Sequence, residues 1–407
     1  MHLDAVIFGG GVAGLWLLDE LLRRGCSVLL LEAAELGSGQ TVVSQGILHG
    51  GLKYTLQGLL TPSASAIREM PVVWRNCLAG NQSPALTGTR IRAEFCYLWR
   101  TESVSSRLGM IGAKFGLRVT PQSVSKQERP AVLKHCPGTV ARLEEQVISP
   151  AELIADLSQR NRDSLLKIDA EHGLAFEVEK PGLIRLIQIT QPESQQQMEL
   201  KPRHVIFTAG AGNENLRRQA GLTSGVMQRR ALQMVMLRGE LPTLNGHCVD
   251  GAKTRVTITS DLDSSQRTVW QVGGQIAEEG VSMEASTLIA HTKSELETVL
   301  PGLDLDDVEW ATYRVDRAEA VTSGGKRPET FQIVREGNTI TAWPTKLVLA
   351  PKLAEEIAAN IEPHTIVDAD LNSLTGWPRP DVALPPWETC PRWYRWDQIE
   401  ENEEKAA

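Results

Sequence analysis

The N-terminal segment combines two short apolar runs with the pattern of an amphipathic helix between them. Residues 3–8 are mainly apolar and end at Gly9, which is typical of a buried parallel strand. Apolar side chains then recur at helical spacing, at Val12, Leu15, Leu18 and Leu22. Residues 27–31 form a second apolar run, and Glu32 stands at its end. The pattern predicts a strand, helix and strand unit.

The turn between the first strand and the helix reads GGGVAG and satisfies the GxGxxG pattern. In that pattern Gly9 permits the tight turn, Gly11 lets a pyrophosphate approach the backbone, and Gly14 lets the helix pack closely. The first amides of the helix, at Val12 and Ala13, face the anion together with the positive end of the helix dipole. We therefore predict a diphosphate site at the start of this helix.

Glu32 is placed to accept hydrogen bonds from a ribose diol, because it follows the second strand of the unit. A glycine-rich turn followed by a solvated glutamate would explain the same residues without a ligand. The coincidence of strand, helix, second strand and acid favours dinucleotide binding over that alternative. NAD and FAD share this pattern, so the turn does not choose between them.

Composition narrows the function classes. The chain has 407 residues, 42% hydrophobic and 23% charged, which indicates a globular protein of more than one domain. No apolar run approaches the roughly 18 residues of a membrane helix. A formal charge of -8 argues against nucleic acid as the main ligand. The six cysteines and the eight histidines have no metal or disulfide spacing, so we expect no metal and a cytoplasmic location.

Residues 37–41 (GSGQT) and 44–54 (SQGILHGGLKY) follow the first unit. They resemble the serine-rich loop and the IHGGLRY segment of FAD-dependent glycerol-3-phosphate dehydrogenases, and more broadly the D-amino-acid-oxidase-like family, which includes glycine oxidase and 2-hydroxyglutarate dehydrogenase. Later segments resemble the same family in the expected order: residues 149–152, 204–216, 238–240 and 338–361. The resemblance implies FAD as the cofactor.

The resemblance also implies an α/β fold, with a doubly wound, Rossmann-like FAD-binding domain and an inserted mixed-sheet α+β substrate domain. We expect residues 1–75, 140–225 and 320–365 to form the FAD-binding domain. Residues 76–139 and 226–319 would form the substrate domain, and 366–407 a C-terminal arm rich in Trp and Pro.

Beyond the glycine turn and Glu32, the resemblance implies three further groups of flavin contacts. The first lies after the second strand, at Thr41, Ser44, Gln45 and Gly46. The second is the turn after the strand at 204–209, with Ala209 and Gly210. In the third, the family has a glycine-rich loop where this chain has Thr345, Lys346 and Leu347. Lys346 would place a positive charge near the flavin N1 and O2 edge, or else is a surface lysine.

Flavin chemistry needs a protein group that takes a proton from the substrate and groups that bind its anion. By residue type and by the resemblance, His49 is the candidate base, and a core histidine that holds the following turn is the alternative. Arg314 occupies the place of the family's substrate-binding arginine, although Val315 stands where the family has proline. Arg327 and Tyr54 are further substrate-binding candidates. Cations near residues 314–327 suit a carboxylate or phosphate.

These observations predict a FAD-dependent dehydrogenase that oxidises a small anionic hydroxy compound of the 2-hydroxy acid or glycerol 3-phosphate type. The alternatives are an amino acid or amine oxidase of the same family, and a non-enzymatic flavoprotein with a partner-binding tail. A colourless NAD-linked dehydrogenase is a third. The electron acceptor would be oxygen, a quinone or a carrier protein. The tryptophan-rich arm wraps its own protein or a partner, or makes a peripheral membrane contact.

Overall fold

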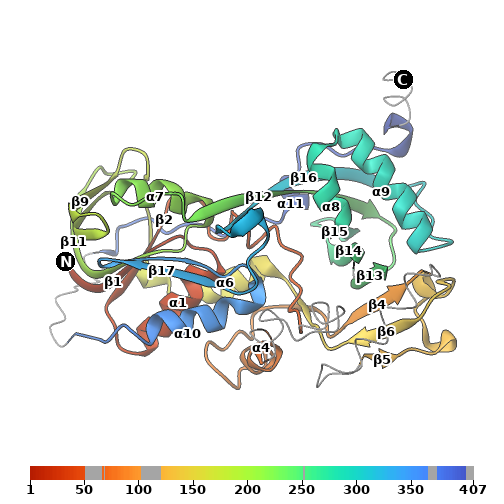
Figure 1. Cartoon of the computed structure of the whole chain (residues 1–407), viewed down its shortest axis with the longest axis horizontal. Coiled ribbons are helices and arrows are strands. Elements are labelled where there is room, and N and C mark those ends of the chain that lie inside the picture. Colours follow the sequence, from red (N-terminus) through yellow and green to blue (C-terminus); the bar gives the residue numbers. More distant parts are fainter. Residues whose placement is uncertain (51–66, 68, 102–120, 251–252, 365–373, 400–407) are drawn as a thin grey trace.

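The computed structural model describes the chain except residues 51–66, 68, 102–120, 251–252, 365–373 and 400–407. Two large sheets form two lobes joined by long strands and connecting segments (Figure 1). Among the described residues, no helix is both long enough and apolar enough to cross a bilayer. The cytoplasmic location stays a prediction.

The first lobe is built on an eight-stranded sheet whose main path runs β17, β18, β11, β1, β2, β8. Neighbouring strands from β18 to β8 are parallel, and β17 pairs antiparallel with β18. Buried apolar runs are typical of such strands, because helices cover both faces of a parallel sheet. The strands are β1 (His2–Phe8), β2 (Val28–Glu32), β8 (Leu165–Lys167), β9 (Leu174–Lys180), β10 (Leu183–Thr190), β11 (Gln197–Phe207), β17 (Gln332–Glu336) and β18 (Thr339–Trp343).

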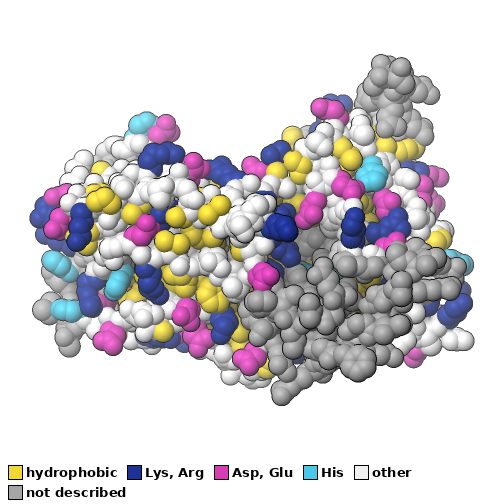
Figure 2. Space-filling model, viewed as in Figure 1, with side chains coloured by type: hydrophobic (Ala, Val, Ile, Leu, Met, Phe, Trp, Pro, Cys, Tyr) yellow, Lys and Arg dark blue, Asp and Glu magenta, His cyan; other side chains and the backbone are white. Residues whose placement is uncertain are grey.

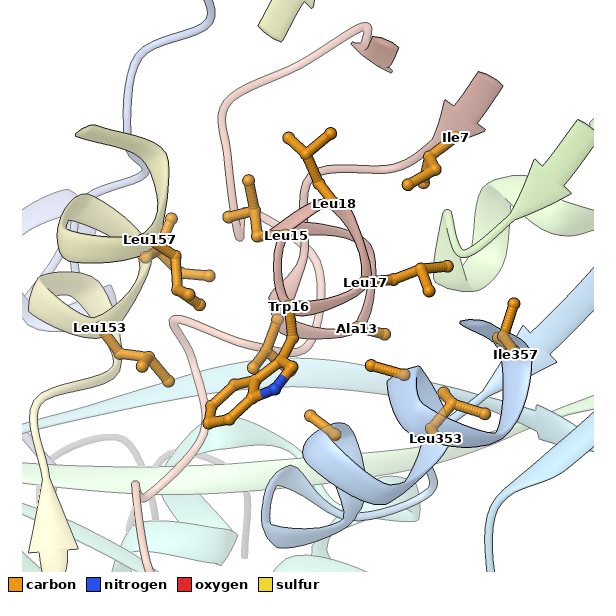
Figure 3. Close-up of a cluster of buried hydrophobic side chains, with 14 of the residues drawn as sticks. Ile7, Ala13, Leu15, Trp16, Leu17, Leu18, Leu153, Leu157, Leu353 and Ile357 are labelled. Carbon is orange, nitrogen blue, oxygen red and sulfur yellow. The ribbon is translucent and has the colours of Figure 1, made fainter. Parts of the chain in front are cut away.

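Helix α1 (Val12–Arg23) lies at the centre of the first lobe and is almost entirely buried. Helices α6 (Pro150–Arg160) and α10 (Ala350–Ala358) pack against it from two sides, as the close-up in Figure 3 shows. Trp16 of α1 meets Trp74 of α4 (Met70–Leu78) with ring centroids 4.7 Å apart. Gly25, with φ of 83°, ends the helix and turns the chain into β2. These contacts fix the position of α1 beside the parallel sheet.

Helix α6 begins at Ser149, whose side chain accepts a hydrogen bond from the amide of Glu152. The Glu152 carboxylate does not return to the amide of Ser149, as a complete capping box would require. It binds the amide and the guanidinium of Arg90 instead, at 3.0 and 2.9 Å. Ser149 therefore caps the start of the helix, while Glu152 joins the helix to a neighbouring segment.

The second lobe is an eight-stranded mixed sheet in the order β16, β12, β15, β14, β13, β4, β6, β5. Helices α8 (Gln275–Glu279) and α9 (Ala285–Val299) pack on it. Its strands are β4 (Cys96–Arg100), β5 (Gln122–Ser123), β6 (Val140–Leu143), β12 (Met227–Gly239), β13 (Gly246–Asp250), β14 (Lys253–Leu262), β15 (Thr268–Gly274) and β16 (Glu309–Ala320). Two short strands, β3 (Ile91–Ala93) and β7 (Val147–Ile148), pair outside both sheets, and α7 (Asn213–Gln219) follows β11.

This architecture confirms the predicted fold class, and its elements cross the predicted domain boundaries at two points. Strand β6 pairs with β4 in the second sheet, although residues 140–143 fall in the range assigned to the cofactor domain. Cys77 and Leu78 of α4 lie in the same apolar core as α1, although their range was assigned to the substrate domain. Side-chain pattern along a short element does not reveal which sheet it joins.

The described part of the C-terminal arm packs against its own chain. Trp377 is buried in the first lobe and donates a hydrogen bond to the carbonyl of Lys167. Trp387, on α11 (Pro386–Thr389), is buried against residues of β12, β15 and β16. Trp393 lies 4.0 Å under the guanidinium carbon of Arg238, and the rings of Trp396 and Trp310 are 6.4 Å apart. The arm thus joins both lobes.

Candidate active site

A cavity of about 1160 Å³ extends from the turn after β1 to the face of the second sheet. Segments from both lobes line it, including the starts of α1 and α8, the loop after β2, and parts of β12, β14 and β16. Acidic and basic side chains are intermixed over the face of the molecule shown in Figure 2, with no broad patch of one sign among the described residues there. Size and position make this cavity the candidate site for a cofactor and a substrate.

The three glycines of the GxGxxG turn have different surroundings. Gly9 has φ of 104°, and a Cβ there would lie 2.4 Å from Ala209 Cα. At Gly14 a Cβ would lie 2.0 Å from the carbonyl oxygen of Gly9, so this glycine permits close packing of the helix. Gly11 lines the cavity, and the nearest atom to its Cβ would be Thr41 Oγ1, at 3.3 Å. Of the three glycines, Gly11 is the one that lines the cavity and whose added Cβ would meet no backbone atom within 4 Å.

No side chain of its own residues caps the start of α1, since the N-cap is Gly11 and the first turn contains no acid. Thr41, from the loop after β2, accepts a hydrogen bond of 3.2 Å from the amide of Val12. A hydroxyl that accepts one hydrogen bond can still donate its own proton. The start of α1 therefore presents three features to the cavity: the positive end of the helix dipole, the backbone of Ala13 and the hydroxyl of Thr41.

Glu32 is held by backbone amides of the turn after β1 and of the turn after β2. Its Oε2 accepts from Gly10 at 2.6 Å, and its Oε1 accepts from Ala33 and Ala34 at 2.8 and 2.9 Å. Glu32 lines the cavity, and its Oε2 has further acceptor capacity. Such a fixed acceptor suits a ribose diol.

Gln45 joins the loop from Thr41 to Gly46 to the second lobe by hydrogen bonds. Gln45 donates from Nε2 to the carbonyls of Thr257 and Gln271, both at 3.0 Å, and its own carbonyl accepts from Arg92. Arg92 is 2% exposed and pairs with Asp261 at 2.9 Å. The Gln45 side chain, predicted to contact the cofactor, thus also connects the two lobes across the cavity.

Two further residues of the same loop have different roles. Gly46 has φ of 70°, and a Cβ there would lie 2.1 Å from the carbonyl of Ile148, so chain packing alone requires glycine. Ser44 Oγ is buried, lines the cavity and has no hydrogen-bond partner among the described residues. A buried hydroxyl of this kind favours a polar ligand group beside it.

The other two predicted flavin segments reach the cavity from β11 and β18. Ala209 and Gly210 line it where β11 ends. After β18, Thr345 has φ of 59° and lines the cavity. Lys346 is 9% exposed and donates from Nζ to the carbonyl of Glu329 at 3.2 Å, so it is not a surface lysine. Leu347 also lines the cavity.

His49 lines the cavity near the second sheet and contacts two groups that sequence reasoning missed. Its Nδ1 lies 3.5 Å from Glu145 Oε2, and the Nε2 of His247 lies 3.4 Å from that oxygen. The second carboxylate oxygen of Glu145 accepts a hydrogen bond of 2.8 Å from the amide of Gly50. His247 Nδ1 lies 2.9 Å from Thr257 Oγ1. We call His49, Glu145 and His247 the His–Glu–His cluster.

The two inner members of this cluster are buried, with side chains 2% exposed for Glu145 and 1% for His247. Burial raises the pKa of the Glu145 carboxyl, but hydrogen bonds from His247 and His49 outweigh that effect, and its pKa lies well below the usual value. Glu145 is therefore an anion inside the protein. One side-chain nitrogen or oxygen atom from each of the three residues lies within 4.8 Å of the other two. The sequence did not reveal this cluster, because the three residues are far apart in the chain.

Arg314, predicted to bind substrate, does not line the cavity. Its side chain is 56% exposed and pairs with Asp316 at 3.1 Å. The next four residues of β16, 315–318, all line the cavity, and one of them, Asp316, is the partner of Arg314. The structure thus leaves Arg314 outside the lining, next to a residue that belongs to it. Its role in substrate binding stays a prediction.

Arg317 supplies the cation that Arg314 does not. It lines the cavity, and its closest ion pair is with Glu278 at 3.7 Å. Its Nε is buried with no hydrogen-bond partner among the described residues. Arg230, beside it on β12, is satisfied by a two-pronged pair with Glu319 at 2.8 and 3.0 Å. Arg327 is exposed and lines the cavity, while Tyr54 lies outside the described residues.

Comparison with known proteins agrees with this geometry. Residues 4–324 match the family described as FAD dependent oxidoreductase (DAO). The FAD-dependent oxidoreductase PA4991 of Pseudomonas aeruginosa is 38% identical over 392 residues, which are 95% of this chain and 98% of that protein. Its crystal structure superposes with a TM-score of 0.79 and 34% identity, covering 96% of this chain and 98% of that one.

More distant similarities either cover a short segment or have low sequence identity. The aerobic glycerol-3-phosphate dehydrogenase of Escherichia coli is 39% identical over 51 residues, 12% of this chain and 10% of that protein. Glycine oxidase from Geobacillus kaustophilus has a TM-score of 0.64 at 15% identity, covering 91% of this chain and 98% of that one, which shows the fold alone. With the family match and the full-length relative, the chain belongs to the DAO family of FAD-dependent oxidoreductases.

Proposed function

We propose that this flavoenzyme oxidises the hydroxyl-bearing carbon of a small anionic compound, of the 2-hydroxy acid or glycerol 3-phosphate type. The single observation that carries the proposal is that the imidazole of His49 and the guanidinium of Arg317 line one cavity. A hydroxyl substrate needs a proton acceptor, and an anionic one needs a fixed cation. The short match to glycerol-3-phosphate dehydrogenase, which is one of several such matches, supports a hydroxyl over an amine.

The cavity residues fit FAD. The cavity is lined by Gly11, where a Cβ would meet no backbone atom, and three of its lining residues carry a buried polar atom with no hydrogen-bond partner among the described residues: Ser44 Oγ, Arg317 Nε and Trp343 Nε1. We place the diphosphate at Gly11, Val12 and Ala13, and the ribose at Glu32. The remaining cofactor contacts would come from Thr41, Ser44, Gln45, Ala209, Gly210, Thr345, Lys346 and Leu347.

Bound FAD supplies a two-electron acceptor that takes the hydride from the substrate carbon. His49 takes the hydroxyl proton, so the alcohol loses one hydride and one proton and becomes a carbonyl compound. Arg317 and Arg327 bind the anionic group and orient the carbon that is oxidised. Lys346, which lines the cavity, would supply a positive charge that favours reduction of the bound cofactor. The acceptor that reoxidises the protein is oxygen, a quinone or a carrier protein.

Anaerobic mixing of the purified yellow protein with 2-hydroxy acids and with glycerol 3-phosphate tests the proposal. We expect at least one of these compounds to bleach the visible flavin band, while amino acids leave it unchanged. Bleaching by amino acids alone would replace the proposal with the amine oxidase alternative. The same reduced protein, mixed with oxygen or with a soluble quinone, identifies the acceptor by the rate at which the band returns.

A further inference from the structure

The His–Glu–His cluster contains two buried titratable groups that hydride transfer and anion binding do not use. Glu145 lies between the imidazoles of His49 and His247, with one oxygen 3.5 and 3.4 Å from them, and Glu145 and His247 belong to segments about a hundred residues apart. Burying a carboxylate costs free energy unless hydrogen bonds compensate it. Its retention beside a cavity-lining imidazole calls for a role beyond packing.

The contacts of Glu145 divide cleanly between its two oxygens. Oε1 accepts from the amide of Gly50, the residue after His49, at 2.8 Å. Oε2 faces both imidazoles, His49 Nδ1 at 3.5 Å and His247 Nε2 at 3.4 Å. One carboxylate therefore contacts both the ring of His49 and the backbone next to it, and so fixes the orientation of that side chain.

We propose that Glu145 and His247 are positioning residues that hold His49 in the tautomer with the proton on Nδ1. This inference rests on the proposed function of His49 as the proton acceptor. In that tautomer Nε2 carries the lone pair that accepts the substrate proton. The carboxylate acts as the acid partner does in a catalytic triad: it selects the tautomer and stabilises the imidazolium that forms.

His247 contacts both Glu145 and Thr257. Its Nε2 faces Glu145, and its Nδ1 lies 2.9 Å from the hydroxyl of Thr257, which can donate to it. With Nδ1 accepting, the Nε2 proton of His247 points to the carboxylate. Glu145 then receives hydrogen bonds from both imidazoles and from Gly50. The distances of 3.4 and 3.5 Å are long for hydrogen bonds, as is common at a catalytic base before substrate binds.

A divalent metal ion is the competing explanation, because two imidazoles and a carboxylate also form a common ligand set. The positioning role is favoured because the proposed oxidation of a hydroxyl needs a proton acceptor, and the three residues supply and orient one without a further component. Under the metal explanation Nδ1 of His49 would be occupied by the ion, and Nε2 would carry the proton. The two explanations thus predict opposite tautomers of His49.

Nitrogen-15 NMR of the flavin-bound holoenzyme, labelled with [15N]histidine, measures that tautomer directly. The signals of His49 are assigned by their loss in His49→Gln. At neutral pH we expect the Nδ1–H tautomer in the wild type, and a shift of the population to Nε2–H in Glu145→Gln. Glu145→Asp keeps the buried charge but withdraws the carboxylate, so the same shift is expected there if the first variant loses its flavin.

Asp169→Asn provides a matched control, because the pair of His172 and Asp169 has the same 3.5 Å separation but is solvent-exposed. It should leave the His49 signals unchanged. Nε2–H in the wild type, an unchanged tautomer in both Glu145 variants, or stoichiometric metal in elemental analysis of the wild type would overturn the inference. None of these readouts needs a substrate, so failure of every hydroxy compound to bleach the flavin would refute the proposed function separately.

Discussion

Arg317 pairs with Glu278 across 3.7 Å at the cavity wall, and this weak pair leaves most of its guanidinium available to a ligand. Burial lowers the pKa of Arg317 to about 10, and the neighbouring Arg230 contributes to the shift. The group remains charged at neutral pH. A buried cation with one distant partner gains free energy when an anion binds beside it.

Replacing Arg317 with alanine should raise the KM for the anionic substrate by roughly 10- to 100-fold. The estimate follows from a charge-assisted hydrogen bond worth about 1.5 to 3 kcal/mol. Flavin content should stay normal. Arg314→Ala is the matched control, because Arg314 lies on the same strand with its side chain 56% exposed. Steady-state kinetics that change in the control and not in Arg317→Ala would restore the original assignment.

Replacing Gly11 with valine should yield protein without flavin, because the added side chain projects into the cavity where we place the diphosphate. The absorbance ratio of the flavin band to the protein band measures this loss. Gly376→Ala is the control, since no atom lies within 4 Å of a Cβ at that position. A full flavin complement in Gly11→Val would contradict the placement of the cofactor.

Asp4 should make the protein more stable at neutral pH than at acid pH. Burial opposes its ionisation, but hydrogen bonds from Ser27, from the amide of His364 and from Arg203 lower its pKa below the ordinary value. A lowered pKa in the folded state contributes stability above the unfolded-state pKa, and that contribution is lost as pH falls through the folded-state pKa.

Asp4→Asn should therefore cost about 1 to 2 kcal/mol of unfolding free energy at neutral pH, and the difference should shrink in acid. Urea unfolding at a series of pH values measures both quantities. Glu193→Gln, at an exposed position, serves as the control and should follow the wild-type curve. A difference between Asp4→Asn and wild type that does not depend on pH would contradict this account.

One thiol should react fast with a disulfide reagent in the native protein. All six cysteines are free, and only Cys390 is not buried. Burial raises the pKa of Cys248 to about 12 and that of Cys77 to about 11, so neither supplies much thiolate at mildly alkaline pH. A thiol titration should show one fast group that disappears in Cys390→Ser. Two or more fast groups in the native protein would show that the lobes open more than the packing indicates.

Much of the first lobe could be predicted from local pattern. The apolar runs at β1 and β2, the stripe on α1 and the glycines between them follow from rules that hold within a few residues. Strand β11 was predicted in the same way. The strand β6 was assigned to the wrong lobe, because its pairing with β4 involves residues far away in the sequence.

The functional site shows the same difference between features predicted from local sequence and features set by long-range contacts. Sequence alone identified the family and predicted the diphosphate turn and His49 as a candidate base, since each depends on residues adjacent in the chain. Only the tertiary structure decided that Arg317 lines the cavity and Arg314 does not, because the packing of the two lobes sets which part of β16 borders the cavity. It also brought Glu145 and His247 to His49, because contacts between distant segments form only when the two sheets pack together.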